Sequence, residues 1–467
     1  MKTIRGFFGL LVIFSWAIIA CDDDGGSKTR VSSTLEGAPL SVFAATDGDG
    51  RELWITDGTE EGTEQVRDIN EGAGDGIPDE LKNEFAYLNG KAYFQATNGS
   101  DGYELWVSDG TAVGTEMLDD FNTGSGDFNP YGFTLFNGRL YFAGTTSTGT
   151  ELWKTDGTAA GTIKAPAAGE PTLLNPTGMA VYNGKLYFSA ADSGDTDLWC
   201  IDRTGDASEI EVNSGGSGNP MHLTEMDDML YFTAVTASYG RELWKTDGTQ
   251  ANTALVSDID SDTTGSINDT LVVYNDKLYF AADDGESGNE LWCSDGTEEG
   301  TRCAADINEG AGNSNPDEMI VFNGRLYFSA TSAGQNRLYV FDSTTGTAGE
   351  IRMTYETYTA YSPMFLSVFN GNIYFRAEIT ALGNDLWVSD GTAEGTQLVE
   401  QINTTAEPSN SNPWNFTVME DRLYFCADDG AHYFELWTSD GTSDGTSMVR
   451  DIYVGGVTDG SWPFGVD

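Results

Sequence analysis

The chain has 467 residues, of which 39% are hydrophobic and 12% aromatic, so it can bury a large core, and global disorder is excluded. Its 74 acidic side chains outnumber its 23 basic ones and give a net charge of −51, which repels nucleic-acid phosphates and anionic membrane surfaces. A nucleic-acid partner is therefore excluded, and the acidity indicates either solvation in salty or extracellular water or a set of cation-binding loops.

The first 20 residues have the pattern of an export signal. Lys2 and Arg5 precede an apolar run at residues 7–20, which has the length of a signal-peptide core and is too short to span a bilayer. The run ends in Ile-Ile-Ala-Cys, which resembles the lipobox of bacterial lipoproteins, where the cysteine carries the lipid. We therefore predict a signal peptide at residues 1–20 and a lipid anchor at Cys21. The protein would then be held at the outer membrane, the cell surface or the periplasmic side.

The rest of the chain divides into a short tether and a long repeat array. Residues 21–39 are polar and rich in Gly, Ser and Thr, which predicts a flexible tether. From residue 40 to residue 467 an aromatic residue recurs at intervals of 45 to 52 residues, a period typical of propellers and solenoids. The nine positions are Trp54, Trp106, Trp153, Trp199, Trp244, Trp292, Tyr339, Trp387 and Trp437.

Every unit shows the same succession of strand and turn signals. In the third unit two apolar segments flank Asn137-Gly138, the pair favoured in tight hairpins. A Glu-Leu-Trp strand follows, then Asp-Gly-Thr-x-x-Gly-Thr, then a last short strand. The pattern predicts an all-β fold, a β-propeller of four-stranded antiparallel blades with about nine repeat units and almost no helix.

The two ends of the array predict how it closes. Residues 40–43 match the second strand of other units and have no first strand before them, whereas residues 462–466 match the place where first strands begin. We therefore expect the N- and C-terminal strands to join in one blade, so that the ring has no open edge.

The repeated Glu-Leu-Trp-x-x-Asp-Gly-Thr motif is interpreted as scaffold. Adjacent Leu and Trp on a strand face opposite sides, and Asp, Thr and Gly are the residues that close tight turns. In these residues the chain resembles the bacterial ELWxxDGT-repeat proteins, which are secreted or attached to the cell surface. Seven units carry the Leu-Trp-x-x-Asp-Gly-Thr core, and the units of Trp199 and Tyr339 depart from it. The resemblance implies location and fold, and no particular activity.

The crossings between units are predicted to form the ligand-binding face, because the Asn-Gly and Asp-Gly-Thr turns share the other face. Carboxylates at alternate positions also suit calcium, and Asp258, Asp260 and Asp262 come nearest to such a loop. Capping of turns by Asp and Asn is the alternative for all these residues. The predicted ligand-face residues are Asp68, Asn70, Asp120, Asn122, Asp306 and Asn308.

The cysteines and histidines lead to two further predictions. Cys293 and Cys303 flank one hairpin on adjacent strands, so a cross-strand disulfide is expected in an exported protein. The two histidines, His222 and His432, stand in no metal-ligand or triad pattern, and no catalytic residue is assigned. The predicted function is that of a lipid-anchored binding or adhesion module for a glycan or a surface protein. The alternative is an exported hydrolase that acts on a polysaccharide.

Overall fold

The computed structural model describes residues 19–20, 33–35, 38–78, 85–166, 171–261, 265–267, 270–405 and 409–454. Strands follow one another along nearly all of this chain, and the one helix within these ranges is the three-residue 3-10 helix η1 (Gln250–Asn252). The prediction of an all-β fold with almost no helix is confirmed.

Each predicted repeat unit corresponds to a group of short strands. The first four units contain β3 (Ala38–Thr46), β4 (Arg51–Thr56) and β5 (Glu64–Arg67); β6 (Ala86–Leu88), β7 (Lys91–Ala96), β8 (Glu104–Ser108) and β9 (Glu116–Met117); β10 (Tyr131–Phe136), β11 (Arg139–Thr146), β12 (Gly149–Thr155) and β13 (Ile163–Lys164); and β14 (Leu174–Tyr182), β15 (Lys185–Asp192), β16 (Asp195–Ile201) and β17 (Ala207–Ile210).

The remaining units follow the same order. They contain β18 (Met221–Met226), β19 (Met229–Thr236), β20 (Gly240–Thr246) and β21 (Ala254–Ser257); β22 (Val272–Tyr274), β23 (Lys277–Asp283), β24 (Asn289–Ser294) and β25 (Arg302–Ala305); β26 (Asp317–Phe322), β27 (Arg325–Ser332), β28 (Gln335–Asp342) and β29 (Thr347–Ile351); β32 (Tyr361–Phe369), β33 (Asn372–Ile379), β34 (Gly383–Ser389) and β35 (Gln397–Glu400); and β36 (Trp414–Met419), β37 (Arg422–Asp428), β38 (Phe434–Ser439) and β39 (Ser447–Arg450). A separate hairpin joins β30 (Thr354–Tyr355) to β31 (Tyr358–Thr359).

Within a unit the strands pair as an antiparallel meander. In the third unit Phe136 lies opposite Arg139, and the intervening Asn137 and Gly138 have φ angles of 50° and 72°, as a tight hairpin turn requires. The predicted Asn-Gly hairpins are therefore confirmed there. The third and fourth units share one sheet, because Glu151 of β12 also pairs with Leu174 of β14.

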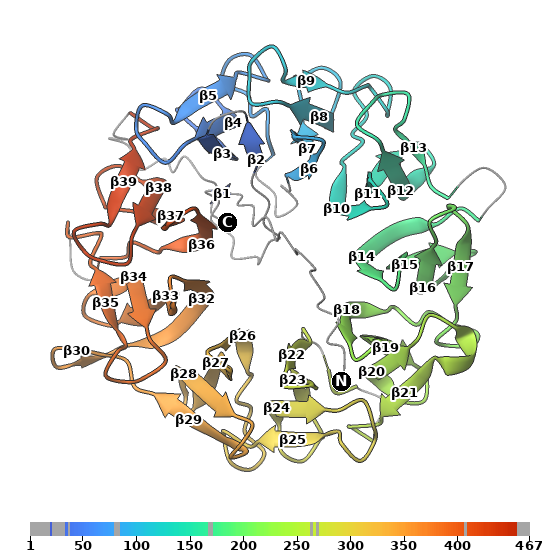
Figure 1. Cartoon of the computed structure of the whole chain (residues 1–467), viewed down its shortest axis with the longest axis vertical. Coiled ribbons are helices and arrows are strands. Elements are labelled where there is room, and N and C mark those ends of the chain that lie inside the picture. Colours follow the sequence, from blue (N-terminus) through green and yellow to red (C-terminus); the bar gives the residue numbers. More distant parts are fainter. Residues whose placement is uncertain are drawn as a thin grey trace, which may run out of the picture.

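The units follow one another around a circle, with the first strands of most units nearest the centre (Figure 1). The first unit has another arrangement: the two-residue strand β1 (Ile19–Ala20) pairs with β3 in parallel, and β2 (Ser33–Leu35) pairs with it antiparallel. Its sheet thus begins before residue 40, the predicted boundary. The predicted joining strand near the C-terminus lies outside the described residues.

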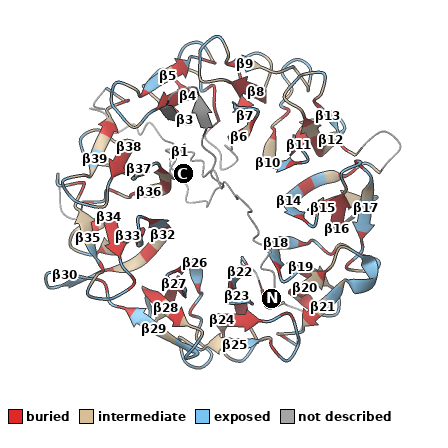
Figure 2. Cartoon of the chain, viewed as in Figure 1, coloured by how far each residue is buried: buried red, intermediate tan, exposed pale blue. Residues whose placement is uncertain are grey.

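The core consists of hydrophobic clusters between neighbouring units, and buried residues concentrate within the sheets (Figure 2). Trp106 packs against the first unit, whereas Leu105 packs against the third. The prediction that Leu and Trp face opposite sides is confirmed. Phe43 and Trp54 of the first unit pack in the same way on Tyr424 and Leu436 of the last unit.

Candidate functional site

The repeated Asp-Gly-Thr turn is closed by its own side chains. In the first unit Asp57 Oδ1 accepts hydrogen bonds from the Thr59 amide at 2.9 Å and from the Thr59 hydroxyl at 2.6 Å. The hydroxyls of Thr56 and Thr63 bond to each other at 2.6 Å across the base of the turn. The interpretation of the motif as scaffold is confirmed by these contacts.

The residues of the predicted ligand face lie on the crossings between units and close them internally. Asp120 Oδ2 accepts the Gly124 amide at 2.9 Å, and Asn122 Nδ2 donates to the Asp127 carbonyl at 2.9 Å. The first and sixth crossings repeat this arrangement, with Asp68 and Asp306 accepting and Asn70 and Asn308 donating. Capping, the alternative interpretation, is thus confirmed for these contacts, and a ligand role stays a prediction.

In five units the glutamate that opens the repeated motif holds the crossing from beneath. Glu104 is fully buried, and its two carboxylate oxygens accept the amides of Phe121 and Asn122 at 3.0 and 3.3 Å. The first of these amides lies 17 residues after the glutamate, and this spacing recurs in other units. The pairs are Glu52–Ile69, Glu242–Ile259, Glu290–Ile307 and Glu435–Ile452. This role was not predicted from the sequence, although the constant spacing from the motif glutamate to Ile or Phe could have indicated it.

Burial changes the acidity of these glutamates. It raises the pKa of Glu104 to about 8 and that of Glu52 to about 7, while the backbone amides that bond to them act in the opposite direction. Burial also raises the pKa of Glu242 and of Glu435 to about 7. A raised pKa is often a sign of a functional site, but here each carboxyl is enclosed by its own loop. These groups are therefore structural clasps.

The predicted calcium loop is described only in part. Asp258 and Asp260 lie on the fifth crossing, and Asp262 lies outside the described residues. Among the residues that the structure does describe, no group of three or more His, Cys, Asp or Glu side chains could hold a metal ion. A calcium site made by the three aspartates together stays a prediction.

The predicted Cys293–Cys303 disulfide is wrong, because both cysteines are free thiols. The register explains why: Cys293 lies opposite Arg302, while Cys303 lies opposite Trp292, with an irregularity between Leu291 and Trp292. The two side chains therefore face opposite sides of the sheet. Cys293 packs toward the seventh unit and Cys303 toward the fifth.

The first strands carry a bulge that repeats in position but not in residue. In the third unit the register shifts between Tyr131 and Thr134, and Gly132 has a φ of 70°. In other units non-glycine residues adopt this left-handed conformation, which is strained for large side chains. The equivalent positions hold Gly178, His222, Glu318, Phe365 and Asn415, with φ from 57° to 62°.

The side chains at this bulge position are half-buried and differ in chemistry from unit to unit. His222 Nδ1 lies 3.3 Å from the Thr233 hydroxyl, and the Arg376 guanidinium lies 4.8 Å from the centre of the Phe365 ring. Glu318 accepts the Leu366 amide of the next unit at 3.2 Å, and burial raises the pKa of its carboxyl. The bulge thus places an imidazole, a carboxyl, an aromatic ring and an amide around the inner strands.

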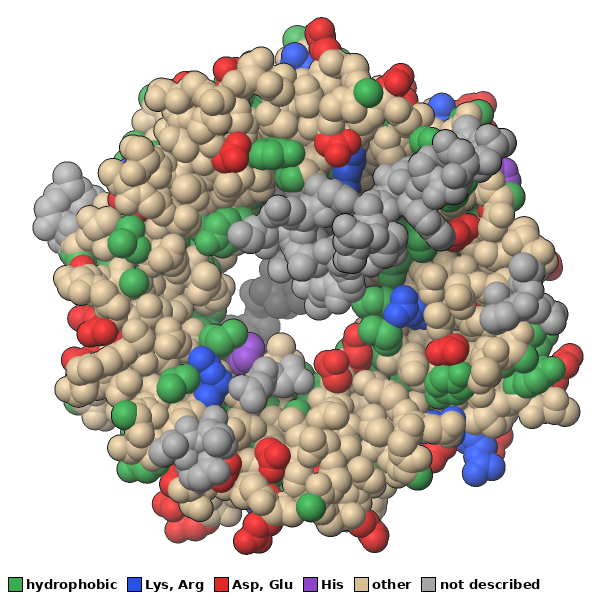
Figure 3. Space-filling view, turned by 180° about the vertical axis from the view of Figure 1, so that it is seen from behind, with side chains coloured by type: hydrophobic (Ala, Val, Ile, Leu, Met, Phe, Trp, Pro, Cys, Tyr) green, Lys and Arg blue, Asp and Glu red, His purple; other side chains and the backbone are tan. Residues whose placement is uncertain are grey.

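The bulges lie near the crossings, at one end of the inner strands. A second set of residues, which are apolar and exposed, lies near the hairpin turns at the other end. Hydrophobic and charged side chains gather at the rim of the central opening (Figure 3). Exposed apolar residues stand two positions before the hairpin asparagine in several units. They are Leu135, Val181, Val273, Val321 and Val368.

No family model matches the chain, and no curated protein matches it. Among solved structures, Porphyromonas gingivalis dipeptidyl peptidase 4 is similar at 10% identity, with a TM-score of 0.51 over 85% of this chain and 65% of that one. Puromycin hydrolase matches at 13% identity and a TM-score of 0.43 over 82% of this chain and 55% of that one. The β-propeller domain of the trilobed protease from Pyrococcus furiosus matches at 14% identity and a TM-score of 0.35, over 66% of this chain and 96% of that one.

The likeness concerns the fold. The chain spans about half the length of two of the peptidase structures that it matches, 49% of a prolyl endopeptidase and 55% of puromycin hydrolase. Four-stranded antiparallel sheets that follow one another around a central opening are the architecture of a β-propeller (Figure 1).

The structure bears on the membrane in one respect only, and it does not test the lipid anchor. Cys21 lies outside the described residues, so lipidation stays a prediction. Within the part of the chain that the structure describes, no helix is long and apolar enough to cross a membrane.

Proposed function

We propose that this protein is an exported, lipid-anchored β-propeller that acts as a binding or adhesion module for a glycan or a surface protein. The ligand would bind at the mouth of the central opening, on the side of the crossings. One observation carries the proposal: the bulge position of the inner strands holds glycine in the third and fourth units and four different side chains, those of His222, Glu318, Phe365 and Asn415, in the fifth, seventh, eighth and ninth, while the surrounding scaffold repeats.

The proposal includes a closed ring of nine blades. The first and last units share a hydrophobic cluster of the same kind as every other neighbouring pair, which supports closure. Cleavage before Cys21 would remove β1 from the mature chain and free the place beside β3 for residues 461–467. Deleting these residues should then lower the melting temperature well beyond the loss of a frayed tail, and an unchanged melting temperature would argue for an open array.

The lipid anchor has its own test. Replacing Cys21→Ser should move the protein from the membrane fraction to soluble or uncleaved forms, because the sulfur that carries the lipid is gone. Unchanged partitioning into detergent would reject the anchor and would leave the ligand-binding proposal standing.

An array of glycans and surface proteins, probed with and without calcium, tests the binding function. The double variant His222→Gly and Phe365→Gly should lose binding to any hit, and it should fold, because Gly132 and Gly178 occupy the equivalent positions in other units. Val113→Ala, at a 93% exposed residue in an outer turn, serves as the control that keeps binding. Binding that survives the double variant would contradict the proposed site, and cleavage of a bound glycan would favour the hydrolase.

A further inference from the structure

Neighbouring units are closed on the hairpin face by one repeated contact. The glycine of the Asp-Gly-Thr turn lies directly over the hydroxyl of a tyrosine from the preceding unit, so closely that a Cβ atom on Gly296 would stand 2.0 Å from Tyr231 Oη. Equivalent positions on other units give 2.0 to 2.6 Å. The pairs are Gly58–Tyr424, Gly157–Tyr93, Gly248–Tyr187, Gly391–Tyr327 and Gly441–Tyr374.

The contact is missing between the sixth and seventh units. There the turn after β28 departs from the repeat: Ser343 stands where the sixth unit has Gly296, and the glycine comes later, at Gly346, where a Cβ atom would meet nothing within 4 Å. Tyr279, which corresponds to Tyr231, instead lines a pocket of about 180 Å³. Liquid water takes roughly 30 Å³ per molecule, so this volume equals about six waters. The pocket has room for a small ligand.

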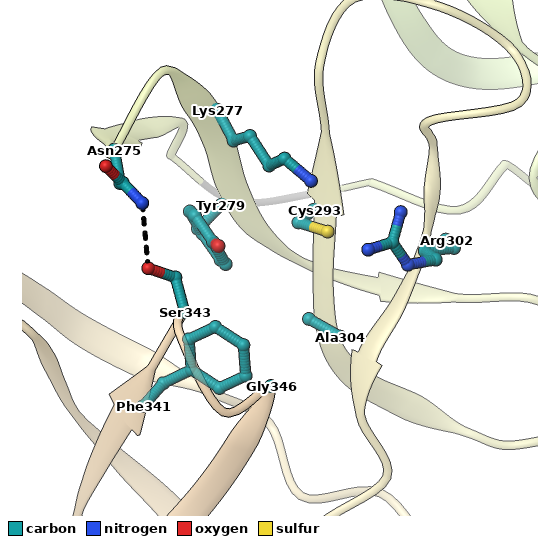
Figure 4. Close-up of a pocket in the computed structure, with 9 residues that line it drawn as sticks. All are labelled: Asn275, Lys277, Tyr279, Cys293, Arg302, Ala304, Phe341, Ser343 and Gly346. Atoms are coloured by element: carbon teal, nitrogen blue, oxygen red, sulfur yellow. Dashed lines mark hydrogen bonds between the residues drawn. The ribbon is translucent and has the colours of Figure 1, made fainter.

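Two cationic side chains converge on this pocket. Figure 4 shows the Lys277 ammonium and the Arg302 guanidinium on either side of the Cys293 sulfur, with Tyr279 and Phe341 on another wall. Neither cation forms a hydrogen bond or an ion pair with any residue that the structure describes. In a chain with a net charge of −51, Lys277 acts on an acid only at longer range than an ion pair, through Asp295, whose pKa it helps to lower.

The adjacent interface shows how such a cation is satisfied elsewhere. In the fifth unit Lys245 takes the place of Cys293 and donates to the Gly296 carbonyl at 2.7 Å, and Ala254 takes the place of Arg302. The sixth unit thus has the small thiol of Cys293 where the fifth has the long side chain of Lys245, and it has Arg302 where the fifth has Ala254. The small thiol leaves the space empty, and the Arg302 guanidinium lies beside it.

The other unit without the repeated turn does not share this arrangement. At the interface between the third and fourth units, the Lys154 ammonium of the third unit lies 6.0 Å from the centre of the Tyr141 ring. The same ammonium lies 3.8 Å from where a Cβ atom on Gly205 of the fourth unit would stand. A lysine therefore occupies the place that Cys293 leaves open. An irregular turn alone does not produce the pocket, which also needs the small residue.

The remaining groups of the pocket are neutral donors. Asn275 Nδ2 donates to Ser343 Oγ at 3.0 Å, and Ser343 Oγ donates to the Tyr274 hydroxyl at 3.1 Å. Burial raises the pKa of the Cys293 thiol and of the Tyr279 phenol, so both stay protonated near neutral pH. Asp295 accepts hydrogen bonds from the Thr297 amide and hydroxyl at 3.0 and 2.6 Å.

We propose that the pocket between the sixth and seventh units binds a small oxyanion, a phosphate, sulfate or carboxylate group, between Arg302 and Lys277. A guanidinium can bond two oxygens of such a group at once, and an ammonium adds a third charge-assisted contact. The Tyr279 and Phe341 rings would pack against a small organic body that carries the group. This site is distinct from the central opening and does not rest on the function proposed for it.

Calorimetric titration of the purified protein with inorganic phosphate, sulfate, acetate and glucuronate tests the proposal, with glucose as the neutral control. We expect saturable binding of at least one anion and none of glucose. Tighter binding of glucuronate than of acetate would identify a group carried on an organic body. Equal affinities would identify a free anion.

Variants place the binding in the pocket. Lys277→Met and Arg302→Gln introduce the residues found at the equivalent places of the fifth and eighth units, Met229 and Gln397, so both should fold. Together they should weaken binding at least tenfold. Arg352→Gln removes a charge from an exposed arginine elsewhere and should leave binding unchanged. No saturable binding, or an equal loss in the control, would overturn the proposal.

Discussion

The second and third units both carry Glu-Leu-Trp in their third strand, yet the glutamate has different partners in the two. Glu104 accepts two backbone amides of its crossing, whereas Glu151 accepts the Lys164 ammonium and the Thr148 hydroxyl. Burial raises the pKa of Glu104 to about 8. For Glu151 burial acts in the same direction, but Lys164 and Thr148 outweigh it and lower the pKa. The motif sets the position of the carboxyl, and the segments on either side of it decide its partners.

The two interfaces of the sixth unit differ in the same way, here at the Asp-Gly-Thr turn. The interface between the fifth and sixth units is closed by Gly296 over Tyr231, and the next interface leaves Tyr279 facing a pocket. The units that keep the whole repeat are scaffold, and chemically distinct sites arise where one part of a unit departs from it.

Alanine at the two turn glycines should separate these interfaces most strongly. Both glycines have positive φ, 83° at Gly296 and 67° at Gly346, so each substitution carries about 1 kcal/mol of backbone strain. Gly296→Ala also forces a methyl group against the Tyr231 hydroxyl, which adds about 1–3 kcal/mol of overpacking. Denaturant unfolding should show the larger loss for Gly296→Ala. Equal losses would mean that the tyrosine contact contributes nothing.

The clasp should be the next largest effect. Above about pH 8, where the Glu104 carboxyl is ionised, Glu104→Gln replaces an acceptor oxygen with an amide that faces a backbone N–H, so a buried donor loses its partner at a cost of about 1–3 kcal/mol. Glu151→Gln should cost about 1 kcal/mol or less, because the Lys164 side chain is 42% exposed and its ion pair is screened by solvent. Urea unfolding measures both, and a larger loss for Glu151→Gln would reverse the comparison.

The sequence predicted the strands, the hairpins and the opposite sides of the sheet that Leu and Trp face, because these depend on local periodicity and turn chemistry. It placed Asp120 and Asn122 correctly on a crossing. It did not show the clasp beneath them, because a contact over 17 residues depends on how the loop folds back. The prediction of the disulfide was wrong because one irregularity of the strand register beside Trp292 turns Cys303 to the other side of the sheet. The pocket depends on the volume missing between two units, which no single segment shows.

The dependence of stability on pH should follow the clasps. Their folded-state pKa values are raised from 4.5 to about 7 for Glu52 and about 8 for Glu104, so the folded state keeps its protons longer than the unfolded state. This contribution is fully present below about pH 4.5 and is lost as the pH rises through 7 to 8. We expect the melting temperature to fall over this window and Glu104→Gln to flatten the fall. An unchanged slope in that variant would contradict the assignment.

Glu151 should act in the opposite direction. Its pKa is lowered, so its contribution is present above about pH 4.5 and is lost on further acidification. Glu151→Gln should therefore change the melting temperature at neutral pH more than at pH 3. A constant difference between variant and wild type across that range would reject the ion pair with Lys164.

The smallest effect concerns the thiols. Cys293 and Cys303 should both be alkylated after unfolding without a reductant, because they lie on opposite sides of their sheet. Peptide mapping that finds them joined would show that the register beside Trp292 differs from the one described here.

The most direct test of how one motif residue serves two roles is a carboxyl ¹³C NMR titration of glutamate-labelled protein. The Glu104→Gln and Glu151→Gln variants assign the two resonances. We expect Glu104 to titrate with a midpoint near 8 and Glu151 below the ordinary value of 4.5. If both carboxyls titrate together near 4.5, the crossing does not decide the environment of the glutamate, and the distinction between regular and departing units is contradicted.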